Sequence, residues 1–67
     1  MRSNCAFLSR LEAWHHKNNV DYINKFQDDI TYDINMGGWW IRRDSRAYTL
    51  AILLGFNLED PFKKTVN

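Results

Sequence analysis

The sequence predicts an all-α fold: a compact three-helix domain with a short C-terminal helical turn. Two observations predict it. Apolar residues recur at helical spacing in three segments, and residues that favour helix ends stand near the limits of these segments. The 67 residues suit one small globular domain, 1–67, and a hydrophobic content of 45% with 15% aromatic residues is typical of a folded chain.

The first helix is expected between about residues 3 and 19. Ser3 or Asn4 can cap its N-terminus by accepting backbone N–H bonds. An apolar stripe at helical spacing follows, formed by Phe7, Leu8, Leu11 and Trp14. The asparagines at 18–19 are a plausible end, because asparagine tolerates a left-handed backbone.

The segment 20–36 fits two structures. Ile23, Phe26, Ile30 and Ile34 share one helix face, and Gly37 could then end a second helix. However, residues 30–36 also alternate between apolar and polar, and strand-forming residues follow the two glycines. The helix covers more residues and is preferred; the alternative is an α+β fold with a β-hairpin at about residues 30–43.

The third helix is expected from Asp44 or Ser45 to Leu54, with Gly55 ending it. Its apolar residues cover nearly the whole circumference, which is typical of a buried central helix. Asp60 and Pro61 then predict the start of the short C-terminal turn, since proline is favoured at the first helical position. The stretch 49–66 resembles a helix-turn-helix in outline, but its second helix would have little room for base-reading side chains.

Composition argues against several function classes. Cys5 is the only cysteine, so no disulfide can form within the chain, and no motif predicts a metal site, a cofactor or catalysis. No signal peptide is visible, and the longest nearly apolar stretch, 47–56, is shorter than the roughly 20 residues that a membrane span needs. We therefore expect a non-enzymatic, soluble cytoplasmic protein that does not bind membranes.

Charge is balanced overall but unevenly distributed. Nine lysines and arginines against eight acids give a net charge of +1, which is not typical of a nucleic-acid-binding protein. Acids dominate residues 21–33, whereas arginines dominate residues 39–46 beside two tryptophans. The arginines are poorly placed for the dipole of the helix that follows, which suggests that they pair with the acids.

These features predict a small protein-binding module, an adaptor, regulator or inhibitor, by analogy with small inhibitors that phages carry. Tryptophan and arginine are enriched at interface hot spots, and the surplus of aromatic residues suggests a partner or a homo-oligomer. The expected interface residues are Trp39, Trp40, Arg42, Arg43 and Arg46, with the acidic residues Asp28, Asp29 and Asp33.

The alternative function is a nucleic-acid-binding regulator, because arginines beside tryptophans can neutralise phosphates and stack on bases. Its expected residues are Trp39, Trp40, Arg42, Arg43, Arg46, Lys63 and Lys64. The protein-binding function ranks first, because the net charge is close to zero.

Overall fold

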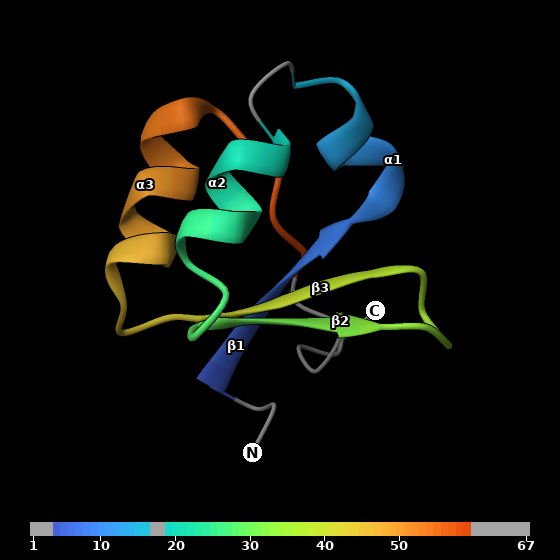
Figure 1. The fold of residues 1–67 in the computed structure, drawn as a ribbon, viewed down its shortest axis with the longest axis horizontal. Coiled ribbons are helices and arrows are strands. Elements are labelled where there is room, and N and C mark those ends of the chain that lie inside the picture. Colours follow the sequence, from blue (N-terminus) through green and yellow to red (C-terminus); the bar gives the residue numbers. More distant parts are fainter. Residues whose placement is uncertain (1–3, 17–18, 60–67) are drawn as a thin grey trace, which may run out of the picture.

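The chain folds as an α+β protein (Figure 1). The computed structural model describes residues 4–16 and 19–59. Within them, three short helices pack against a three-stranded antiparallel sheet. The all-α prediction was therefore wrong, and the alternative hairpin within residues 30–43 is confirmed.

The predicted first helix is divided between a strand and a helix. Strand β1 spans Cys5–Ser9, and helix α1 spans only Arg10–Trp14. The helix begins at Ser9, whose side chain accepts the backbone N–H of Glu12 at 3.1 Å. Four successive side chains of β1 are buried, which fits a strand covered on both faces and not an amphipathic helix.

The predicted second helix also changes to a strand partway along. Helix α2 spans Asn19–Lys25, and turn residues 26–29 lead into strand β2, Ile30–Asp33. Strand β3, Gly38–Arg42, pairs antiparallel with both other strands, in the order β1-β3-β2. The alternation in residues 30–36 therefore indicated the hairpin, and tertiary pairing overrode the helical spacing.

The turn of the hairpin explains both neighbouring glycines. Gly37 has a φ of +72° and closes the turn by donating its N–H to the Asp33 carbonyl at 2.8 Å. It is thus a turn residue and not the predicted helix end. Gly38 permits a close approach: a Cβ there would lie 2.4 Å from Phe7 Cζ and 2.5 Å from the Leu8 carbonyl oxygen.

Helix α3, Arg46–Leu54, confirms the third predicted helix and its caps. Ser45 is the N-cap, and Gly55 ends the helix in the left-handed conformation at φ +87°. The prediction of a central position was wrong. Among the residues of α3, only Ala47 and Ala51 are buried. The helix therefore packs on one face of the sheet through its small residues and exposes its other side.

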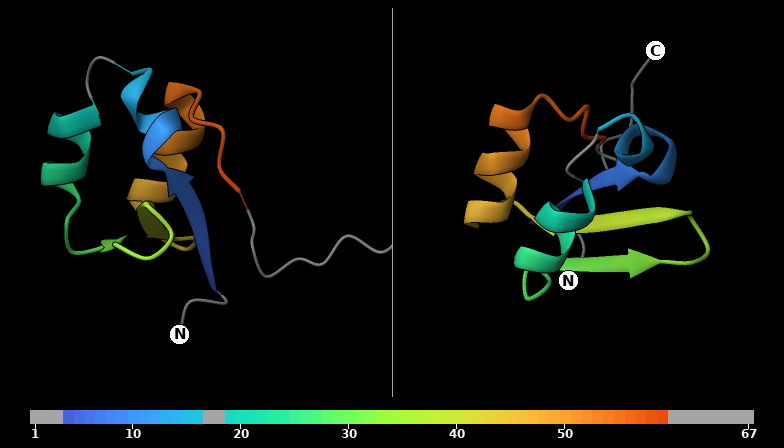
Figure 2. Two further views of the ribbon diagram at one scale, coloured as in Figure 1. Left: turned by 90° about the vertical axis from the view of Figure 1, so that its right-hand side faces the viewer. Right: turned by 45° about the horizontal axis from the view of Figure 1, so that its top comes forward.

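The sheet has a different apolar cluster on each face. All three helices cover one face (Figure 2), where Leu8 and Ile41 are fully buried. Cys5, Phe7 and Trp40 form a separate buried cluster, with side chains on the opposite side of the strands.

After α3 the chain returns to the sheet. Phe56 joins the core, and Glu59 pairs with Phe7 through backbone bonds of 2.7 and 2.8 Å. The predicted C-terminal turn, 60–66, lies outside the described residues. Across the described part of the chain, no helix is long and apolar enough to cross a membrane.

Candidate nucleic-acid interface

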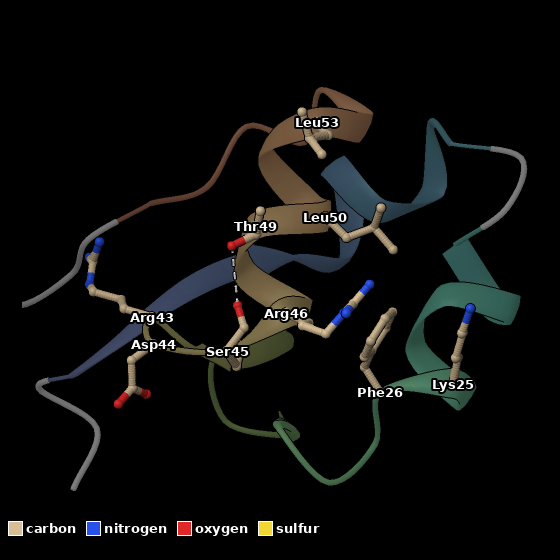
Figure 3. Close-up of a pocket in the computed structure, with 9 residues that line it drawn as sticks. All are labelled: Lys25, Phe26, Arg43, Asp44, Ser45, Arg46, Thr49, Leu50 and Leu53. Atoms are coloured by element: carbon tan, nitrogen blue, oxygen red, sulfur yellow. Dashed lines mark hydrogen bonds between the residues drawn. The ribbon is translucent and has the colours of Figure 1, made fainter.

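A groove of about 520 Å³ lies between the end of α2 and the start of α3. In Figure 3, Arg46 and Leu50 extend from α3 toward Phe26, and Lys25 stands on the far side of Phe26. Lys25 and Arg46 are exposed, whereas Phe26 and Leu50 pack against the core. The groove therefore combines an apolar floor with the positive charges of Lys25 and Arg46 on its two sides, and Arg43 and Asp44 also line it.

The start of α3 is held in place by Ser45. Its hydroxyl accepts the backbone N–H of Tyr48 at 3.3 Å and donates to the Arg42 carbonyl at 2.6 Å. This capping satisfies an N–H group that would otherwise lack a partner at the helix start. Arg46 is consequently fixed on the first turn of α3, facing the groove (Figure 3).

The opposite wall is tied to α3 through Tyr22. Its hydroxyl donates to the Ala47 carbonyl, and burial raises the pKa of Tyr22 to about 12. The ring of Tyr22 lies 5.5 Å from that of Phe26, measured between centroids. Lys25 Nζ lies 5.7 Å from the centroid of Phe26, within the range of a cation–π contact. The side chains of α2 therefore meet α3 in a fixed arrangement.

The three predicted arginines do not form one cluster. Arg42 lies between two carboxylates, with its guanidinium 3.5 Å from Asp29 and 3.2 Å from Asp44. The expected pairing of the arginines with the acidic segment is thus confirmed at Asp29. Arg43 packs over the ring of Tyr48 and points away from Arg46 (Figure 3). Only Arg46 of the three faces Phe26.

The two neighbouring tryptophans point to opposite faces of the sheet. Trp40 is 3% exposed, packs against Phe7 and donates its indole N–H to Asp33 at 2.9 Å. Trp39 lies on the helix-covered face, half-buried, with its ring 5.2 Å from that of Tyr32. Trp40 is therefore a core residue and does not belong to the exposed site.

The predicted acidic face is also divided. Asp28 is exposed in the turn after α2, and Asp29 pairs with Arg42. Asp33 accepts the Trp40 indole and the backbone N–H groups of Asn35 and Met36. The two bonds from backbone N–H groups fix the hairpin turn, so Asp33 has a structural role.

Sequence analysis missed the polar face of α2. Asp21, Asn24 and Lys25 are exposed on it, and Gln27 follows in the turn. Lys25 drew no attention because it stands alone among acids in the sequence. Lys25 and Arg46 line the same groove only because α2 and α3 pack side by side, and the spacing of residues in the sequence does not reveal this packing.

The remaining candidates contribute no further site. Lys63 and Lys64 lie outside the described residues. Within the described ranges, no group of three or more histidine, cysteine, aspartate or glutamate side chains is placed to hold a metal ion. Cys5 is buried in the cluster with Phe7.

Glu12 connects α1 to the segment after α3. Its carboxylate accepts the backbone N–H of Asn57 at 3.0 Å and contacts His16 Nε2 at 3.1 Å. The bond from Asn57, followed by the one from His16, lowers the pKa of Glu12 below its ordinary value. This carboxylate therefore helps to hold the chain beyond α3 in place.

The comparisons with known proteins supply no relative. No family model, no curated protein and no solved structure matches the chain.

Proposed function

We propose that this chain is a small DNA-binding module in which α2 lies against duplex DNA while Lys25 and Arg46 contact phosphates. The observation that carries the proposal is the placement of α2. It is the second of two short helices, it exposes Asp21, Asn24 and Lys25 together with Val20, and two exposed cations flank the groove at its end.

The order of the elements supports this role. Residues 15–18 join α1 to α2, a length typical of the turn in a helix-turn-helix. In that motif the second helix enters the major groove and reads base edges. Here β1 precedes the helix pair and a hairpin follows it, an order resembling that of winged helix-turn-helix domains. Topology alone does not establish function, so the side chains carry the rest of the argument.

The side chains of α2 suit a contact with DNA. An α-helix with its side chains is about 10–12 Å across, so α2 can enter the roughly 12 Å wide major groove. The Asn24 amide is a group that can pair with the edge of adenine. Lys25 and Arg46 are placed to contact phosphates, which position a protein on DNA without reading sequence.

The balance of charge predicts weak binding that depends modestly on salt. Asp21 and Asp28 are exposed near the same helix and oppose a polyanion. Two phosphate contacts predict a log–log slope of about −2 for the binding constant against salt concentration. Neutralising either acid should therefore strengthen binding.

Fluorescence anisotropy with a labelled random-sequence duplex, measured over a series of salt concentrations, tests the proposal. We expect Lys25→Gln and Arg46→Gln each to weaken binding and to reduce the salt slope by about one unit. Asp28→Asn should strengthen binding. Arg43→Gln is the matched control, because Arg43 lines the groove but packs over Tyr48 and points away from Phe26, and it should leave the slope unchanged. No measurable binding at low salt, or equal effects of all three cation variants, would refute the role.

A protein-binding module is the second candidate, favoured by apolar side chains that are left exposed on α3. Leu53 is 77% exposed and Ile52 51%. Exposed apolar patches commonly mark interaction sites. Ile52→Asn, a neutral substitution outside the groove, should abolish binding to such a partner and leave DNA binding through Lys25 and Arg46 unchanged. The adaptor, regulator or inhibitor role stays a prediction.

A further inference from the structure

A second cavity, of about 330 Å³, lies where α1, α2 and β3 meet. The residues of α2 that line it differ from Lys25, the residue of α2 that lines the groove beside Arg46. Its volume is at the lower end of the range for small-molecule sites. The described residues that line it are Arg10, Trp14, Val20, Ile23, Asn24 and Trp39.

The composition of this lining is selective. Four of the six lining residues are apolar and two of these are tryptophans, whereas Arg10 supplies the only charge among them. Across the described part of the chain, no carboxylate lies within ion-pair distance of the exposed Arg10 guanidinium. The site therefore presents one positive charge at the edge of an apolar space.

Two of its walls are held by the fold. The backbone N–H of Arg10 donates to the Gly37 carbonyl at 2.9 Å, which ties the start of α1 to the hairpin turn. Trp39 packs against Tyr32 on the neighbouring strand. In contrast, Trp14 is 80% exposed and Val20 61%, so apolar surface at the cavity is left in water. A bound apolar group would cover that surface.

We propose that this cavity binds a small planar aromatic carboxylate. The ring lies among the tryptophan and aliphatic side chains, and the carboxylate pairs with Arg10. A guanidinium can hold a carboxylate through two parallel hydrogen bonds, which suits a charged group on a planar ligand. The absence of an acid among the lining residues selects an anion over a cation. Asn24 lines this cavity and also belongs to the proposed DNA contact, but the test of the cavity requires no DNA.

The probe is 2-naphthoate, with the neutral 2-naphthamide as its matched analogue. Each is titrated into the isotope-labelled full chain and followed by NMR, and affinities are measured by calorimetry. We expect saturable shifts of the Trp14 and Trp39 indole signals and of the Val20 and Ile23 methyl signals. The amide should bind about tenfold more weakly than the carboxylate, because it lacks the charge-assisted bond.

Two exposed positions allow substitution without removing core contacts. Arg10→Gln should weaken 2-naphthoate about tenfold and leave 2-naphthamide unchanged, and Trp14→Ala should weaken both. Arg46→Gln and Leu53→Ala are the matched controls, since both residues lie outside the cavity, and they should change neither affinity.

Five outcomes would overturn the proposal. If the protein bound the two probes equally, the ligand's charge would have no role. If wild type and Arg10→Gln bound 2-naphthoate equally, Arg10 would have no role. Unsaturated or scattered shifts would remove the site itself. Concentration-dependent shifts of the same signals without ligand, with dimers in sedimentation, would assign the surface to a second copy. Binding of an acidic peptide but not of 2-naphthoate would assign it to a protein partner.

Discussion

The two faces of the sheet are stabilised in different ways. On the helix-covered face, Leu8 and Ile41 are fully buried beneath side chains from all three helices. On the opposite face, the cluster is small and includes two aromatic rings, Phe7 and Trp40, with centroids 5.0 Å apart. A hydrogen bond from Trp40 to Asp33 adds a polar link between β3 and β2. The first face depends on many apolar contacts, and the second on a few specific ones.

This difference explains why two tryptophans stand side by side in the sequence. Successive residues of a strand point to opposite faces, so Trp39 and Trp40 belong to different environments. Grouping them as one surface cluster was an error of treating neighbours in sequence as neighbours in space. Similarly, Arg43 and Arg46 are close in sequence but point in different directions (Figure 3).

The largest expected effect separates the two tryptophans. Trp40→Ala should cost about 3–5 kcal/mol of the free energy of unfolding, since it removes a buried ring and leaves Asp33 without that donor. Such a loss could unfold so small a domain. Trp39→Ala should cost clearly less because Trp39 is half-buried. Urea titrations followed by circular dichroism measure both, and equal losses would contradict the assignment of the two faces.

The next largest effect tests how closely β1 and β3 approach. Gly38→Ala should destabilise by about 1–3 kcal/mol, because its Cβ would collide with the Phe7 ring and with backbone. Gly37→Asn is the control, since a Cβ there meets open space and asparagine tolerates a positive φ. If Gly38→Ala melted like the wild type in thermal scans, the close packing of Phe7 would be wrong.

A smaller effect concerns the helix side, where Glu12 holds Asn57. Because the folded state lowers the pKa of Glu12, its stabilisation is present above the unfolded pKa and is lost as pH falls through the folded value. Glu12→Gln should therefore reduce stability at neutral pH and flatten the acid part of the profile. Urea midpoints measured from neutral to acid pH give both results. An unchanged profile would show that this contact contributes nothing.

The smallest effect is expected on the outer side of α3. Leu53→Ala should change stability by no more than about 0.5 kcal/mol, because Leu53 is exposed. Leu8→Ala, on the fully buried side chain, should cost about 2–5 kcal/mol. Thermal melts of the two variants compare the same substitution at an exposed and at a fully buried leucine. A large loss at Leu53 would indicate that its surface is covered, for example by a second copy.

Local signals in the sequence determined a definite part of this protein. Ser45 and Gly55 delimit α3 as expected, because a side-chain cap and a left-handed glycine act within one helical turn. The glycines at 37–38 and the alternation before them indicated a hairpin, although that pattern was ranked second. The opposite charges of the segments that contain Asp29 and Arg42 suggested a contact between them, and the structure has one such ion pair at 3.5 Å.

Only the tertiary structure decided the rest. Residues 5–8 suit a helix by spacing, but pairing with β3 makes them a strand because it satisfies their backbone while both faces are buried. The apolar residues around α3 were no guide to its depth, since only its alanines are buried, whereas Leu53 and Leu54 are exposed. The groove of Lys25 and Arg46 and the cavity at Arg10 each join residues from separate elements. Such sites arise from packing between elements, which residue spacing within one segment does not encode.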